Sequence, residues 1–89
     1  MPHLRTVNLF QCRQLDDDAL LAFAVHCPGL LAVDVAQCAL VTEDGIRAFL
    51  GAAPGLAVLS MNYISGSNAG AHEEMRERSQ AEFPAVSIW

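Results

Sequence analysis

The sequence predicts an α/β fold in which short parallel strands form a sheet backed by helices on one side. Prolines recur every 26 residues, at Pro2, Pro28 and Pro54. Cys12 and Cys38 keep the same interval. Within each interval the apolar residues first alternate, as in a strand, and then follow helical spacing. The chain is 53% hydrophobic and 17% charged, a balance typical of a folded domain.

The period divides the chain into repeated units. With 89 residues there is room for one domain, residues 1–89, with repeats at about 2–27, 28–53 and 54–83 and a partial fourth at 84–89. A single unit of strand, loop and helix cannot bury its apolar side alone, whereas stacked copies share a core. About three units are the minimum expected to be stable.

The first unit sets the pattern. Val7 and Leu9 alternate with polar or exposed positions, which predicts a strand with one buried face. The apolar residues that follow have helical spacing: Leu20, Phe23, Ala24 and Cys27. Asp16 precedes this helix and is its expected N-cap. Two further aspartates place negative charge at the positive end of the helix dipole.

The second unit repeats the first closely. Val33 and Val35 form the expected strand, and Thr42 is the expected N-cap of the next helix. The helical apolar positions are Ile46, Phe49, Leu50 and Ala53. The prolines at 28, 54 and 84 are expected to end the three helices.

The third unit begins like the others and then departs. Leu59 and Met61 predict a strand, but Ile64 replaces the cysteine and the sequence GSNAG at 66–70 lengthens the loop. A helix is predicted over about 71–83, with few apolar residues to fix it. After Pro84, the last residues begin a further strand.

The central repeat carries a resemblance to a known family. Leu30-x-x-Val33-x-Val35-x-x-Cys38-x-Leu40 follows the leucine-rich repeat consensus, with cysteine at the Asn/Cys position. This resemblance implies a leucine-rich repeat solenoid with parallel strands on the concave face, helices on the convex face and about three repeats.

Two neighbouring stretches refine the resemblance. Residues 38–46, CALVTEDGI, and 26–30, HCPGL, resemble the cysteine-containing subtype, which is similar to the repeats of F-box/leucine-rich-repeat proteins. The resemblance is close from residue 2 to about 64 and loose over 66–89. Because the first repeat starts at Pro2, we expect no F-box ahead of it.

The resemblance implies a non-catalytic protein–protein interaction module. In that family the array is similar to the substrate-recognition platform of an SCF-type ubiquitin ligase, while a separate F-box docks the ligase adaptor. The implied partner is a protein of the ubiquitin conjugation pathway, either a ubiquitylation substrate or a ligase component. The alternative is a truncated or vestigial repeat fragment with no partner of its own.

Charge argues against nucleic acid and anionic membranes as partners. Ten acidic residues against five basic ones give a net charge of −5, which repels phosphate groups. Residues 48–72 lack charged side chains and are long enough to span a bilayer. Pro54-Gly55 and the polar residues 66–70 interrupt them, so we expect no membrane span.

The cellular compartment is predicted from the cysteines and the first residues. Three cysteines are an odd number, and two occupy equivalent places in the repeat, which disfavours a disulfide framework. The first ten residues lack the pattern of a secretory signal. We therefore expect a reducing compartment, the cytoplasm or the nucleus.

No cluster of residues predicts a reaction, a cofactor or a metal site. Cys12 and Cys38 are expected to point into the core. The histidines occupy different phases of the repeat: His3, His26 and His72. His26 and Cys27 are adjacent on a helix and point about 100° apart, so they do not form a nucleophile–base pair. Residues 66–70 lack the lysine of a phosphate-binding loop. We predict a chain that is not an enzyme and holds no cofactor.

The open face of the strands is the predicted binding surface. Seven residues are expected to line it for a protein partner: Asn8, Phe10, Asp34, Gln37, Ser60, Asn62 and Tyr63. Phe10 and Tyr63 are the expected anchors, because aromatic side chains supply large contact area. The alternative, that either packs locally, stays open. Ala32 and Ala36 make the centre shallow, which favours a peptide or protein surface over a small molecule.

Overall fold

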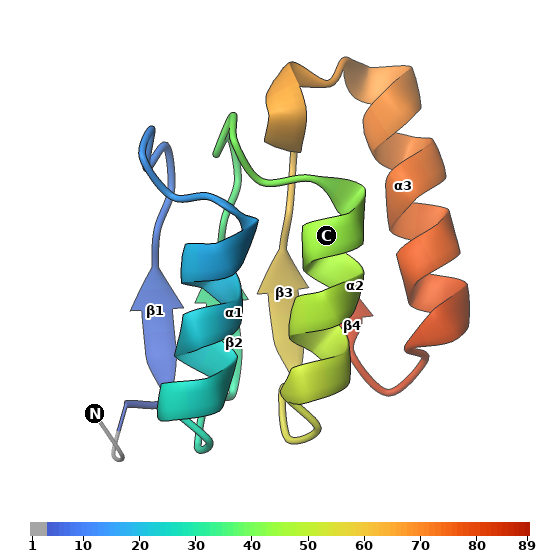
Figure 1. The fold of residues 1–89 in the computed structure, drawn as a ribbon. Helices are drawn as coiled ribbons and strands as arrows, with labels where there is room; N and C mark the ends of the chain where they lie inside the picture. Colours follow the sequence, from blue (N-terminus) through green and yellow to red (C-terminus); the bar gives the residue numbers. More distant parts are fainter. Residues whose placement is uncertain (1–3) are drawn as a thin grey trace.

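Four strands and three α-helices alternate along the chain in the computed structural model, which describes residues 4–89 (Figure 1). The strands form one parallel sheet in sequence order: β1 (Thr6–Asn8), β2 (Ala32–Asp34), β3 (Val58–Ser60) and β4 (Ser87–Ile88). The helices follow the first three strands: α1 (Asp17–His26), α2 (Glu43–Ala52) and α3 (Ala69–Glu82). The expected parallel α/β arrangement is confirmed. Pro2 and His3, at the start of the predicted first repeat, lie outside the described residues.

The strands pair with the register that the 26-residue period predicts. Val7 lies opposite Val33, and Val33 lies opposite Leu59. The last pairing joins Leu59 to Ile88, a longer interval, because a short 3-10 turn (η1, Ile64–Gly66) and the longer helix α3 separate β3 from β4. Residues at equivalent positions of successive units are therefore neighbours in space.

All three helices cover the same face of the sheet, which leaves the other face uncovered (Figure 1). The strand residues that point toward the helices are buried on β2, β3 and β4, and Val7 on β1 is partly buried. The largest fully buried side chains include Leu20, Leu30, Ile46, Phe49, Leu59, Met61 and Ile64. These side chains come from both the helices and the strands with their adjoining turns, so the core lies between the sheet and the helix layer. Burying each of them contributes roughly 1.5–3 kcal/mol to the stability of the fold.

Side-chain caps fix where the helices begin. The side chain of Asp16 accepts a hydrogen bond from Ala19 N at 2.8 Å, and that of Thr42 accepts one from Gly45 N at 3.2 Å. Both predicted caps are confirmed. The side chain of Asn68 accepts a hydrogen bond from Ala71 N at 2.9 Å and caps α3. This helix therefore begins at Ala69, two residues before the predicted start. Each cap stabilises its helix by about 1 kcal/mol.

The two repeat cysteines differ in burial. Cys38 is fully buried, and its Sγ donates to the carbonyl oxygen of Leu9 at 2.9 Å. This bond ties the turn after β2 to the end of β1, as expected for a core cysteine. Cys12 is only partly buried at the edge of the core.

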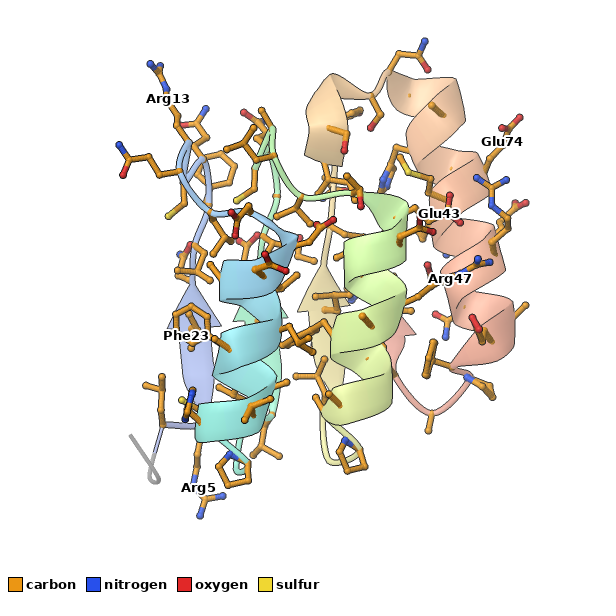
Figure 2. All side chains as sticks on the ribbon, viewed as in Figure 1. Arg5, Arg13, Phe23, Glu43, Arg47 and Glu74 are labelled. Atoms are coloured by element: carbon orange, nitrogen blue, oxygen red, sulfur yellow. The ribbon has the colours of Figure 1, made fainter. Side chains whose placement is uncertain are left out.

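Polar contacts attach α3 to the rest of the molecule. Two guanidinium nitrogens of Arg78 donate to the carboxylate of Glu43 on α2, each at 2.8 Å. Arg47 on α2 lies 3.4 Å from Glu82, and Figure 2 shows Glu43 and Arg47 between the two helices. Met75 adds apolar contact. The helix therefore combines two exposed charge pairs to α2 with the buried side chains of His72 and Ser79. No helix among the described residues has the length and apolar character needed to cross a membrane.

The side chain of Gln80 covers the outer edge of β4. Its Nε2 donates to the carbonyl oxygen of Val86 at 2.6 Å, and its Oε1 accepts from Ile88 N at 3.2 Å. One amide thus satisfies a donor and an acceptor that a further parallel strand would use.

Candidate binding surface on the open face of the sheet

The face without helices carries the side chains that alternate with the buried ones. The register places Asn8, Asp34 and Ser60 side by side on adjacent strands, and we call these three residues the polar row. A second, less polar row lies two residues earlier on the same strands and consists of Thr6, Ala32 and Val58. The sequence predicted all three members of the polar row, and the sheet brings them together.

Local hydrogen bonds fix two side chains of the polar row. Asn8 Oδ1 accepts from the backbone N–H of Phe10 at 3.0 Å. Asp34 Oδ1 accepts from the backbone N–H of Ala36 at 2.9 Å. Such turns hold a short polar side chain in one orientation. Both side chains are thus oriented before any partner arrives.

The polar row lies in a shallow groove. The groove has a volume of about 210 Å³ and is lined by Thr6, Val7, Asn8, Ala32, Val33, Asp34, Val58 and Ser60. Small-molecule sites usually enclose about 300–1,000 Å³. The groove therefore offers room for parts of a larger partner, in line with the shallow centre expected from Ala32.

The turns that follow the strands carry Gln11, Gln37 and Tyr63, spaced 26 residues apart. All three have left-handed backbone conformations, with φ values of 58°, 60° and 60°. Gln11 Nε2 donates to Gln37 Oε1 at 2.8 Å, so the predicted site residue Gln37 is partly engaged within the protein. Neither glutamine nor tyrosine favours positive φ, so the sequence alone did not indicate this conformation.

The aromatic side chains differ in how freely they can contact a partner. Phe10 is 47% exposed at the end of β1. Tyr63 is 42% exposed, but its ring also packs against His72, with centroids 5.5 Å apart and planes tilted by 44°. Local packing therefore accounts for part of the Tyr63 side chain, and Phe10 is the freer anchor. Asn62, the remaining predicted residue, is half-buried beside Tyr63.

Trp89 is a surface residue that the sequence reasoning missed. Its N–H donates to Leu59 O and its carbonyl accepts from Met61 N, both at 2.9 Å. These bonds place it next to Ser60, and its side chain is 63% exposed. The alternation of Val86 and Ile88, both buried, was the signal that could have placed Trp89 on the open face.

A second, larger hollow lies where α3 meets β4. It has a volume of about 530 Å³ and is lined by Asn62, His72, Glu73, Arg76, Gln80, Ser87, Ile88 and Trp89. Its charged groups pair with each other, because Arg76 bonds to Glu73. The hydrogen bond from Arg76 lowers the pKa of Glu73. Gln80 is likewise occupied by β4.

Nucleophiles and metal ligands are scattered over the described residues. Burial raises the pKa of the Cys38 thiol above its usual range, which opposes formation of a reactive thiolate. Cys27 is buried at the end of α1, whereas His26 beside it is exposed. Residues 4–89 contain no group of three His, Cys, Asp or Glu side chains arranged to hold a metal ion. His3 lies outside these residues.

Comparison with models of protein families gave no match, and a search of curated proteins found none similar to this chain. The resemblance to leucine-rich repeats therefore rests on the residues quoted above and on no related protein.

Proposed function

We propose that this chain is a non-catalytic protein-interaction module of the leucine-rich repeat type, which binds a protein segment on the open face of its sheet. One observation carries the proposal. The polar row lies in register on the face that the helices leave uncovered, and exposed Phe10 follows Asn8 by two residues. Oriented polar groups next to an exposed aromatic side chain are typical of a protein-binding surface.

The repeat type is supported by equivalent conformations at equivalent positions. The helix caps Asp16 and Thr42 are 26 residues apart, as are the left-handed residues Gln11, Gln37 and Tyr63. In a leucine-rich repeat solenoid the strands line the concave face, so the proposal assigns the polar row to the concave face.

The kind of partner is proposed from the resemblance alone. A substrate-recognition array of a ubiquitin ligase would bind either a protein to be ubiquitylated or another component of the ligase. The proposed setting is the cytoplasm or the nucleus.

Selection of random peptides displayed on phage against the immobilised chain tests the proposal. Bound peptides are then measured against the double variant Phe10→Ala/Asp34→Lys and against the control Val25→Ala/Glu74→Lys. Val25 and Glu74 are exposed on α1 and α3, and Figure 2 shows Glu74 on the outer side of α3. The control therefore makes matched chemical changes away from the open face.

We expect the open-face variant to lose binding by more than tenfold, while the control binds like the unmodified chain. Absence of any selected peptide, or equal loss in both variants, would contradict the proposed function. Circular dichroism of each variant verifies that it is folded.

A further inference from the structure

Asp34 is the only charged side chain among the described strand residues that face away from the helices. It lies on β2, with Asn8 on one side and Ser60 on the other. Both neighbours are neutral. The open face of the sheet therefore carries a single negative charge near its middle.

No cation within residues 4–89 neutralises this charge. The ion pairs of the described residues lie on α2 and α3, where arginines at 47, 76 and 78 pair with glutamates at 43, 73 and 82. Arg5 and Arg13 project at opposite ends of the first unit and away from the centre of the sheet (Figure 2). The charge of Asp34 is thus available to a partner.

The carboxylate is half-buried and already oriented. One of its oxygens accepts the hydrogen bond from Ala36 N at 2.9 Å, so binding would cost little additional side-chain ordering. An apolar or acidic group placed against Asp34 would leave a partly desolvated charge without a counterion, which is unfavourable. A cationic group would be stabilised there.

The rest of the groove fits the stem of a long cationic side chain. Ala32 and Val58 lie beside Asp34 along the groove and present apolar groups. Lysine and arginine bury their methylene stems along apolar surface while the charged end reaches a polar group. The backbone N–H of Phe10 bonds to Asn8 Oδ1, and its exposed ring is an aromatic group close in the chain to the polar row.

We propose that the open face recognises a lysine or arginine side chain of an extended segment of a partner protein, with the cation paired to Asp34 and its stem on Ala32 and Val58. This inference rests on the proposed function and names the chemistry of the partner.

The peptides selected by phage display provide the probe. Asp34→Asn removes the charge but keeps the oxygen that accepts from Ala36 N, so it should preserve the turn. Glu74→Gln is the matched control, since Glu74 is exposed on α3 and forms no ion pair within the described residues. Dissociation constants are measured for the best peptide and for the same peptide with its cation replaced by norleucine.

We expect the selected peptides to share a lysine or arginine at one position. Removing the cation, or introducing Asp34→Asn, should each weaken binding by about fivefold to tenfold. Both changes together should weaken it no further, because they remove the same contact. Added salt should weaken binding to the unmodified chain more than binding to Asp34→Asn. Glu74→Gln should bind like the unmodified chain.

The outcomes separate the two proposals. Two results would overturn this inference and leave the proposed function standing. In the first, the peptides need Phe10 for binding but share no lysine or arginine. In the second, replacing the cation of the peptide weakens binding to Asp34→Asn as much as binding to the unmodified chain. Absence of any bound peptide would overturn the proposed function, and this inference with it.

Discussion

The thiols of Cys12 and Cys38 occupy equivalent places in the sequence but different environments. Cys38 is fully buried and bonded to Leu9 O, and burial raises the pKa of its thiol. Because the thiolate is the reactive form, iodoacetamide at neutral pH should modify Cys12 well before Cys38. Mass spectrometry of the digested chain measures both rates. In denaturant the two rates should be similar, and equal rates in the native protein would contradict the buried position of Cys38.

Gly45 lies in α2 directly against the first turn of α1. A Cβ atom at this position would lie 2.0 Å from Asp17 Oδ1, which accepts a hydrogen bond from Thr42 N at 2.8 Å. Asp17 would have to move and give up this bond. We expect Gly45→Ala to lower the free energy of unfolding by roughly 1–2 kcal/mol, despite the better helix propensity of alanine.

Gly51, in the same helix, is the matched control for Gly45. It has open space around its Cα, so Gly51→Ala should raise the free energy of unfolding by up to about 1 kcal/mol. Urea denaturation measures both changes. Stabilisation by both alanines would contradict the close contact between α1 and α2.

At the scale of elements, a charge pair joins α3 to α2. The hydrogen bond from Arg78 lowers the pKa of the Glu43 carboxyl below its usual range. A carboxylate with a lowered pKa contributes stability above its unfolded pKa, and that contribution is lost as the pH falls through the folded value. Acidification below the ordinary glutamate pKa of about 4.3 should therefore lower the melting temperature of the unmodified chain.

Arg78→Gln should make this acid dependence smaller, and the change should be modest because solvent screens a pair whose arginine is half exposed. Arg13→Gln is the control, because Arg13 is exposed and forms no ion pair within the described residues. Melting curves recorded between neutral pH and pH 3 test this. The same acid-induced loss in Arg78→Gln as in the unmodified chain would contradict the role of the pair.

Gln80 protects the edge of a second element, β4. Gln80→Ala would free Val86 O and Ile88 N, and exposed strand edges pair with other chains. We expect self-association at concentrations where the unmodified chain does not associate, measured by sedimentation velocity. Glu77→Ala, an exposed change on the same helix, should leave sedimentation unaltered. Identical sedimentation of Gln80→Ala and the unmodified chain would argue that the amide does not guard this edge.

At the scale of the whole molecule, the 26-residue period made most of the fold predictable. The period fixed the strand order and the pairing of Val7 with Val33, and the caps Asp16 and Thr42 followed from local sequence. These features depend on short-range patterns that recur. The polar row was predictable for the same reason, because alternation determines which strand residues share a face.

Features that depend on contacts between dissimilar units could not be predicted in this way. The GSNAG sequence looked like a loop, yet Asn68 caps α3 and the helix passes through Gly70. Packing of Tyr63 against His72 and the cover of β4 by Gln80 join residues with no counterpart in the other units. These contacts depend on how the chain folds in three dimensions, and the 26-residue period contains no information about them.

The amide chemical shifts of the isotope-labelled chain, recorded with and without a selected peptide, test most directly where a partner binds. We expect the largest changes at Asn8, Asp34 and Ser60, and small changes along the exposed sides of α1 and α2. Largest changes on those helices, with the open face unaffected, would contradict the assignment of the sheet as the binding surface.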